Sequence, residues 1–263
     1  MIDIANVLEE YLVASKDKYP RKKLPKFYVS DMGKCLRMRW VKRKGVISEL
    51  SPDVTWLLEM GNLGHEFGYK VLEAKGLLVA CEESVRNEHF SGRFDGLVKG
   101  EEDKLAPFDF KMVKSYKIKM IKSGELDELS LKQLFTYSIM LRDGGRKDIG
   151  NEAAVIYMNK EPGKDSDVPA FYQATYLLNE RREEEIRGEM DKLTDYWVKD
   201  KVPPCTCVGW MKDYNNYAPF CGMNDLEVEE VLKKNNEKKK LITTKEVLYL
   251  VDGEERKELV RVK

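Results

Sequence analysis

Hydrophobic and polar positions follow two different periods along the chain, and the change between them predicts an α/β protein. Residues 105–113 alternate apolar and polar side chains as a half-buried strand does, whereas residues 126–142 repeat apolar positions at helical spacing. Ser51-Pro52 opens a helix that carries His65 and ends at Gly76, because proline suits the first helical position and glycine suits the end. Further helices are predicted at 3–14, 30–44 (capped by Ser30-Asp31) and 179–199, and further strands at 77–88, 90–98, 153–158 and 170–177.

The end of the chain has a pattern of its own. Residues 225–240 are rich in Lys and Glu and predict a helix. Residues 241–251 and 254–262 predict a β-hairpin around Asp252-Gly253. We therefore expect a main domain at residues 1–223 and an extension of helix plus hairpin at residues 224–263.

Composition narrows the class of protein. The chain has 263 residues, of which 42% are hydrophobic and 35% charged, as in globular proteins. Its apolar runs are far shorter than the roughly 20 residues that span a bilayer, and Met1-Ile2-Asp3-Ile4 lacks the order of a secretory signal. We therefore expect a cytoplasmic protein that does not enter a membrane.

Charge is informative only where it is concentrated. Lys+Arg and Asp+Glu both number 46, so the net charge gives no reason to expect nucleic acid. Residues 16–45, however, hold twelve Lys or Arg against two Asp. Such a block can follow a phosphate backbone, or it can be a solvated helix face with a loop, and both interpretations stay open.

Four short motifs follow one another between residues 61 and 137. In order they are Gly61-x-x-x-His65 on a helix, Gly92-x-x-Asp95 in a strand or turn, Asp109-x-Lys111 on a strand, and Gln133-x-x-x-Tyr137 on a helix. Each motif alone has a plain structural explanation, such as a packed histidine, a turn aspartate or a charge at a strand edge. Their order on helix, strand, strand and helix is much less expected by chance, so the set indicates a functional site.

The residue types of this set suit phosphodiester hydrolysis. That reaction needs a cation that binds a phosphate oxygen and lowers the pKa of the attacking water. Asp95 and Asp109 offer the hard oxygen ligands that magnesium and manganese prefer, and a nitrogen from His65 would favour manganese. Lys111 leaves the strand on the same face as Asp109, where it can orient the nucleophile or stabilise charge at phosphorus. Gln133 and Tyr137 are expected to hold the lysine or to touch the DNA backbone.

The order of the motifs resembles that of the RecB-type nucleases of the PD-(D/E)xK superfamily, over about residues 30–222. The resemblance implies a restriction-endonuclease-like core, which is a central mixed β-sheet flanked by helices. It implies a metal-dependent DNA exonuclease acting on single strands or ends, with endonuclease cleavage as a further option. The catalytic residues would be Asp95, Asp109, Lys111, Gln133 and Tyr137, and the ligands of Mg²⁺ or Mn²⁺ would be His65, Asp95, Asp109 and Phe110. The candidate DNA contacts are Lys34, Arg37, Arg39, Arg93 and Tyr137.

Five cysteines in a chain without an export signal argue for metal ligation or buried thiols. Cys35 lies before the first motif, and Cys205, Cys207 and Cys221 lie after the last. This arrangement resembles the iron–sulfur RecB-like nucleases of the CRISPR-associated Cas-four type, which implies a [4Fe-4S] cluster in preference to [2Fe-2S] or zinc. The late cysteines are spaced by one residue and then by thirteen, whereas the family has Cys-x-x-Cys, so the cluster type stays open. Cys81 is expected to be a core residue.

Two other functions are compatible with the sequence. The chain could be a non-catalytic DNA-binding or assembly subunit with protein partners in CRISPR adaptation or recombination. It could also be a zinc-stabilised protein with unrelated chemistry. The complete set of two aspartates and a lysine favours the nuclease.

Overall fold

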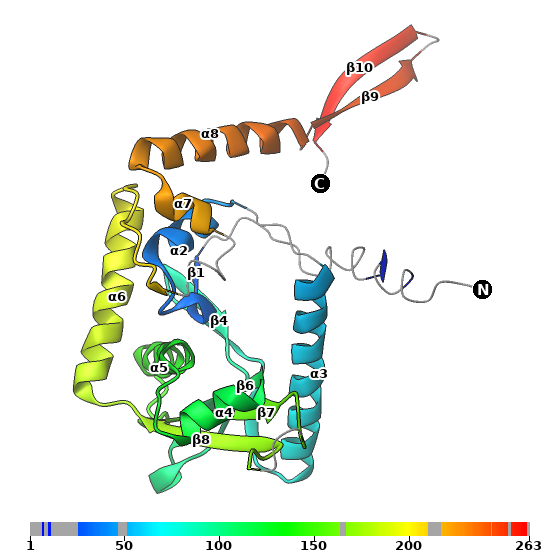
Figure 1. Ribbon diagram of the computed structural model, residues 1–263. Coiled ribbons are helices and arrows are strands. Elements are labelled where there is room, and N and C mark those ends of the chain that lie inside the picture. Colours follow the sequence, from blue (N-terminus) through cyan, green and yellow to red (C-terminus); the bar gives the residue numbers. More distant parts are fainter. Residues whose placement is uncertain are drawn as a thin grey trace.

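The computed structural model describes residues 26–46, 52–163, 167–209 and 217–242, the strands at 244–251 and 254–261, and residues 7, 10 and 11, with side chains up to residue 234. Most of the predicted helix at 3–14 lies outside the described residues. The elements form a mixed α/β fold in which helices cover both faces of a central sheet (Figure 1). This confirms the predicted fold class.

The central sheet has five strands in the order β2-β5-β6-β7-β8. Their bounds are β2 Leu78–Cys81, β5 Gly96–Lys99, β6 Leu105–Val113, β7 Glu152–Asn159 and β8 Phe171–Leu177. β6 and β7 run parallel, whereas the other neighbouring pairs are antiparallel, so the sheet is mixed. A smaller sheet has the order β1-β4-β3, with β1 at Phe27–Tyr28, β3 at Ser84–Arg86 and β4 at Phe90–Arg93.

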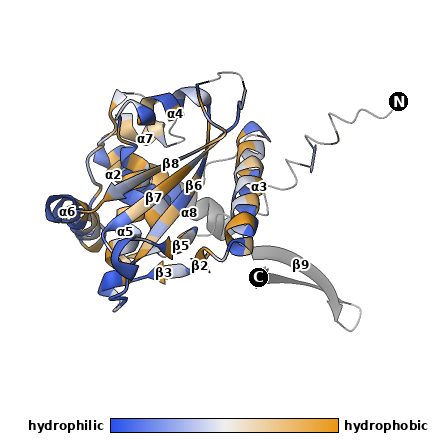
Figure 2. Ribbon diagram, turned by 90° about the horizontal axis from the view of Figure 1, so that it is seen from below, coloured by the Kyte–Doolittle hydropathy of each residue, from blue (hydrophilic) through white to orange (hydrophobic). Residues whose placement is uncertain are grey.

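Helices lie on both sides of β6. α3 (Pro52–Ala74) packs on one face, and α4 (Ser115–Lys122), α5 (Glu128–Asp143) and α6 (Glu180–Val198) lie on the other (Figure 2). The apolar residues Phe108 and Phe110 of β6 face α3, and Asp109 between them faces α5, because successive strand residues point to opposite sides. In its middle, β6 is therefore apolar toward α3 and polar toward α5.

The remaining helices bring an early and a late segment of the chain together. α2 (Leu36–Arg43) packs against α7 (Ala218–Gly222), and α8 (Asp225–Ile242) follows α7. β9 (Thr244–Val251) and β10 (Glu254–Arg261) pair antiparallel, as the predicted hairpin requires. The division of the chain at residue 223 stays a prediction.

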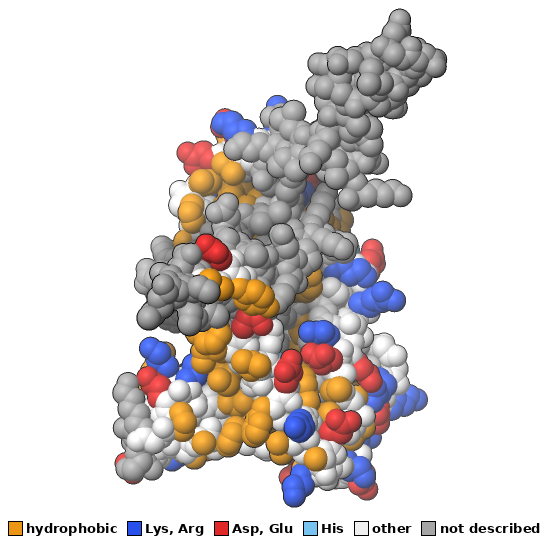
Figure 3. All heavy atoms as spheres, turned by 90° about the vertical axis from the view of Figure 1, so that its right-hand side faces the viewer, with side chains coloured by type: hydrophobic (Ala, Val, Ile, Leu, Met, Phe, Trp, Pro, Cys, Tyr) orange, Lys and Arg blue, Asp and Glu red, His pale blue; other side chains and the backbone are white. Residues whose placement is uncertain are grey.

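α3 is only partly covered by the rest of the described chain. Of its residues, only Thr55, Gly64 and Gly68 are buried. Large apolar side chains along it are exposed and gather on one face of the molecule (Figure 3), namely Val54, Trp56, Leu57, Leu58, Leu63, Phe67 and Val71. No helix among the described residues has both the length and the hydropathy needed to cross a membrane.

Several local predictions need correction. The predicted helix at 30–44 begins only at Leu36, because Asp31 lies in a short 3-10 turn and binds two lysines instead of capping a helix. The predicted strand at 77–88 is two strands, β2 and β3, in different sheets. The predicted strand at 90–98 is also two, β4 and β5, and the chain changes sheets between them.

Two further differences concern single features. α4 was not predicted, because its eight residues are mostly Lys and apolar and carry no capping residue. Cys81 is exposed and is therefore not the core residue that its apolar neighbours suggested.

Candidate active site

The polar face of β6 carries the first part of the site. Asp109 is 2% exposed, and its Oδ1 accepts a hydrogen bond from Gln133 Nε2 at 2.9 Å. Its Oδ2 lies 2.6 Å from Lys111 Nζ as an ion pair, and has no partner in hydrogen-bond geometry among the described residues. Lys111 Nζ also lies 3.5 Å from Gln133 Oε1. One glutamine of α5 therefore contacts both the carboxylate and the ammonium.

The charge state of Lys111 follows from this pairing. Burial disfavours the ammonium, but the carboxylates of Asp109, Asp95 and Asp127 together outweigh that effect and raise the pKa of Lys111 above its ordinary value. Lys111 therefore stays a cation at neutral pH.

Asp95 reaches the same stretch of β6 from the turn where the chain leaves β4 and enters β5. Its Oδ2 accepts a hydrogen bond from the backbone N–H of Phe110 at 2.7 Å. Burial, reinforced by the nearby Asp109 carboxylate, raises the pKa of Asp95 to about 7. The repulsion between the two carboxylates favours a cation or a proton bound at this place.

His65 approaches from the opposite side, on α3. Its Nε2 lies 3.2 Å from the carbonyl oxygen of Phe110, and its Nδ1 lies 3.5 Å from Asp95 Oδ2. Burial lowers the pKa of His65 more than the nearby Asp109 raises it. The ring is thus neutral at pH 7 and can offer a nitrogen lone pair to a metal.

Two glycines that were not singled out from the sequence allow this approach. A Cβ on Gly68 would lie 2.3 Å from the Phe110 ring, and a Cβ on Gly64 would lie 2.8 Å from the sulfur of Met112. α3 therefore packs against β6 at a distance that only glycine permits. The sequence does contain a signal for this, because glycine inside a helix costs about 1 kcal/mol relative to alanine and so indicates close packing. Gly61, in contrast, has no neighbouring atom within 4 Å of the place that a Cβ would take.

Tyr137 packs against the end of β4, just before Asp95. It is 2% exposed, and its hydroxyl donates to the carbonyl oxygen of Arg93 at 2.9 Å. A Cβ on Gly92 would lie 2.6 Å from the Tyr137 ring. The glycine of one motif and the tyrosine of another are therefore packed together, and they hold the turn that presents Asp95.

The predicted ligands fit a divalent cation in kind. His65 Nε2, the Phe110 carbonyl and the carboxylates of Asp95 and Asp109 supply nitrogen and hard oxygen donors, and the buried Asp109 Oδ2 has no hydrogen bond to lose among the described residues. They are less tightly gathered than the cysteines, which are the only group of three or more His, Cys, Asp or Glu in the described chain with all ligand atoms within 4.8 Å. A cation would therefore have to draw these ligands closer together.

The predicted DNA contacts divide into two groups. The side chains of Lys34 and Arg93 are 42% and 63% exposed, respectively. Arg37 and Arg39, in contrast, are 7% and 3% exposed, and Tyr137 is buried as described above. Buried side chains cannot reach a phosphate, so these three predictions are corrected.

Arg37 and Arg39 instead join α2 to the late part of the chain. Arg37 donates to the carbonyl oxygens of Pro203, Phe220 and Met223, and pairs with Asp225 at 2.8 Å. Arg39 pairs at 2.7 Å with Glu189 of α6, which also accepts from Lys132 of α5 at 2.6 Å. The basic block is therefore partly structural, which was the other interpretation of its composition.

The four cysteines that bracket the motifs meet in space. Cys35 Sγ lies 3.9 Å from Cys205 Sγ and 3.8 Å from Cys221 Sγ, and Cys207 Sγ lies 3.4 Å from Cys221 Sγ. Cys35 and Cys205 are 170 residues apart in the chain. Four thiols at this separation can hold a metal or an iron–sulfur cluster.

The thiol of Cys35 is more acidic than those of Cys207 and Cys221. Burial would raise its pKa, but backbone N–H groups, including that of Thr206 at 3.4 Å, outweigh burial and lower the pKa of Cys35 to about 7. Burial raises the pKa of Cys207 to about 11 and raises that of Cys221 further. These two thiols would lose their protons on binding a metal, because thiolates are the ligands.

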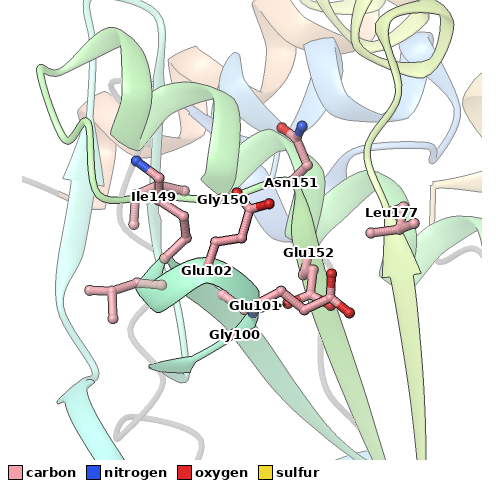
Figure 4. A pocket seen from close by; sticks show the side chains of 11 residues that line it. Gly100, Glu101, Glu102, Ile149, Gly150, Asn151, Glu152 and Leu177 are labelled. Carbon is pink, nitrogen blue, oxygen red and sulfur yellow. Dashed lines mark hydrogen bonds between the residues drawn. The ribbon is translucent and has the colours of Figure 1, made fainter.

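A separate hollow of about 340 Å³ lies beside the turn between β5 and β6 (Figure 4). Glu101, Glu102 and Glu152 line it together with Asn151 and Leu177. None of the predicted site residues contributes to it. The hollow is therefore distinct from the candidate active site.

Comparison with known proteins identifies similar folds and no family. No protein-family model matches the chain, and no curated protein matches it. Among solved structures, SSO0001 has a TM-score of 0.50 and 17% identity over 83% of this chain and 96% of its own. An alkaline exonuclease from Laribacter hongkongensis has a TM-score of 0.42 and 12% identity over 89% and 99%. A phage-related exonuclease from Haemophilus somnus 129PT has a TM-score of 0.35 and 16% identity over 54% and 70%. At these identities the likeness concerns the fold.

Proposed function

We propose that this protein is a metal-dependent deoxyribonuclease that removes nucleotides from single-stranded DNA or DNA ends. One observation carries the proposal: the buried Asp109 and the partly exposed Lys111 form an ion pair on β6, and Asp95 and His65 both contact the Phe110 peptide between them. The resemblance of the motif order to that of the RecB-type nucleases supports it. The main domain, residues 1–223, would carry this activity.

His65, Asp95, Asp109 and the Phe110 carbonyl would hold the cation, either Mg²⁺ or Mn²⁺. When bound, that cation supplies Lewis-acid chemistry at a phosphate oxygen and makes water a better nucleophile. The neutral ring of His65 favours Mn²⁺, because manganese accepts nitrogen ligands more readily than magnesium does.

The side chains of the site have separate tasks. The Lys111 ammonium, kept charged by Asp109, stabilises the negative charge that develops at phosphorus. Gln133 fixes the relative position of Asp109 and Lys111 through its two amide atoms. Tyr137 acts through the backbone of Arg93 and keeps Asp95 directed at β6.

The test is a cleavage assay on labelled linear and circular DNA with added Mn²⁺. Asp109→Asn keeps the shape of the side chain and an acceptor for Gln133, and should abolish product. Lys111→Ala should do the same. The exposed residues Lys99 and Asp191 give matched controls, since Lys99→Ala and Asp191→Asn remove the same charges from surface positions outside the four motifs.

The outcomes separate the candidate functions. Release of mononucleotides from linear DNA, with circular DNA intact, supports an exonuclease, whereas cut circles support endonuclease action. Full activity of folded Asp109→Asn or Lys111→Ala would refute the assignment. DNA binding without any product would favour a non-catalytic subunit of a CRISPR adaptation or recombination complex.

We further propose that the four cysteines hold a [4Fe-4S] cluster with a structural role. The thiolate donor set and the resemblance to the iron–sulfur nucleases support this. A single zinc ion is the second candidate, because tetrahedral Zn–S bonds of about 2.3 Å place the sulfurs about 3.8 Å apart. This is close to the 3.4–3.9 Å of the Cys35–Cys205, Cys35–Cys221 and Cys207–Cys221 pairs. A cluster would need the thiols to spread apart.

Absorption and metal analysis distinguish the two. Brown protein that absorbs near about 400 nm and contains iron supports the cluster. Colourless protein with one zinc per chain would contradict it and leave the nuclease proposal untouched.

A further inference from the structure

α4 combines features that the proposed active site does not use. It begins directly after β6, at Ser115, and residues 114–123 contain four lysines and no acidic residue. Ser115, Ile118 and Ile121 are buried at a spacing of three. A second stripe of the helix, beside the buried one, carries Tyr116, Lys119 and Lys122, which are again three apart and lie next to one another. We call this stripe the outer face of α4.

This outer face is open to solvent. Tyr116 is 63% exposed, and Lys114, Lys119 and Lys122 are all exposed. Lys122 donates to the carbonyl oxygen of Asp167 at 3.1 Å, which uses only part of its donor capacity. A single exposed aromatic ring is common on proteins and does not by itself indicate a binding site. Here the lysines on the same face are the reason to consider one.

Contacts place α4 beside β7, the strand that pairs with β6 at Lys111. Ser115 Oγ donates to Asn159 of β7 at 3.1 Å, and Lys117 Nζ lies 3.4 Å from Asp127 Oδ1 at the start of α5. Asp127 also accepts from the hydroxyl of Tyr157 at 3.2 Å, and Tyr157 is the direct neighbour of Lys111 in the β6–β7 pairing. α4 is thus fixed through two hydrogen bonds and one ion pair to the strand next to Lys111.

We propose that the outer face of α4 binds the single-stranded DNA segment next to the cleaved phosphodiester, with Tyr116 stacking on a base and Lys119 and Lys122 contacting phosphates. This inference rests on the proposed nuclease function and names a surface for its substrate. A base face is open to an aromatic ring only when the strand is unpaired, and sequence-tolerant stacking between basic side chains is how proteins hold single strands. It also replaces the contacts at Arg37 and Arg39, which the fold buries.

The experiment measures binding of a fluorescent oligothymidylate by anisotropy at several salt concentrations, without added divalent cation so that no strand is cut. The variants are Tyr116→Ala, Tyr116→Phe and the double variant Lys119→Ala/Lys122→Ala. The matched control is Lys99→Ala/Lys192→Ala, which removes the same charge from exposed positions on β5 and α6.

Three results are expected. The α4 double variant weakens binding about 10-fold and reduces the salt slope by about 1.4, since each phosphate contact on a single strand contributes about 0.7. Tyr116→Ala weakens binding about 10-fold with little change in slope, and Tyr116→Phe keeps it, because stacking needs the ring alone. The control pair changes binding by less than about twofold, as non-contacting surface charges do.

The inference is overturned if the α4 variants, still folded by their thermal unfolding, bind like the control pair. That result leaves the nuclease proposal standing, since cleavage with Mn²⁺ is measured separately. Wild-type protein that binds the oligonucleotide through α4 but never cuts it would refute the nuclease and retain the surface.

Discussion

Replacing Gly68 by alanine is the sharpest perturbation that the structure offers. The added methyl would lie 2.3 Å from the Phe110 ring, and ordinary carbon contacts are about 3.5–4.0 Å, so helix and ring must separate by roughly 1.2–1.7 Å. The ring has little room, because Phe108 lies 5.1 Å and Tyr69 5.6 Å from it between centroids. The helix is therefore expected to move, and His65 with it.

The expected magnitude has two parts. Overpacking of a filled core costs about 1–3 kcal/mol. Displacement of a positioned group by about 1 Å can cost about 100-fold in rate, so cleavage and Mn²⁺ affinity should fall together. Gly61→Ala is the matched control, since nothing lies within 4 Å of its methyl position and both substitutions gain the same helix propensity of about 1 kcal/mol.

The assay combines urea unfolding with calorimetric titration of Mn²⁺. The free energy of unfolding of Gly68→Ala should lie about 1–3 kcal/mol below that of Gly61→Ala. Adding Phe110→Leu to Gly68→Ala removes the ring that the new methyl group would clash with, and keeps the backbone carbonyl of residue 110. The double variant should therefore recover much of the metal affinity. If Gly68→Ala and Gly61→Ala are equally stable and bind Mn²⁺ equally well, the close packing of α3 does not position His65.

Three other predictions concern single groups. Tyr137→Phe should lower the free energy of unfolding by about 1 kcal/mol, because it loses the hydrogen bond to the Arg93 carbonyl. An unchanged urea midpoint would show that this bond contributes no stability. Burial raises the pKa of Asp95 from 3.8 to about 7, so the folded state favours the protonated carboxyl. The stability that this carboxyl contributes is full below about pH 4 and is lost as the pH rises to about 7. Asp95→Asn should therefore stabilise metal-free protein more at pH 8 than at pH 4, and a difference independent of pH would contradict this. Cys221→Ser should reduce bound metal and thermal stability, whereas Cys81→Ser, at an exposed position, should change neither; equal metal content in both would refute the four-cysteine centre.

The elements with strong periodicity were predictable from the sequence. β6 has the predicted bounds, and α3 begins at Pro52 as expected. The changes of sheet at Asp95 and between β2 and β3 were not predictable, because apolar alternation continues across them and carries no information on which strand pairs with which.

The candidate site was predictable in composition and only partly in arrangement. The four motifs do approach one another around the Phe110 peptide. Burial of Arg37 and Arg39 could not be read from the chain, since their partners, among them Glu189 and Asp225, lie more than 140 residues away in sequence. A cluster of basic residues has the same composition whether it faces solvent or an acidic partner. The roles of Gly92 and Tyr137 became apparent only as a packed pair.

The most direct test of the whole account is the position of Mn²⁺ in a crystal of the protein, located by its anomalous scattering. The account predicts one peak bonded to His65, Asp95, Asp109 and the carbonyl oxygen of Phe110, at about 2.0–2.3 Å from each donor. It also predicts that the peak disappears in Asp109→Asn. Manganese bound elsewhere, or retained unchanged in that variant, would contradict the proposed catalytic centre.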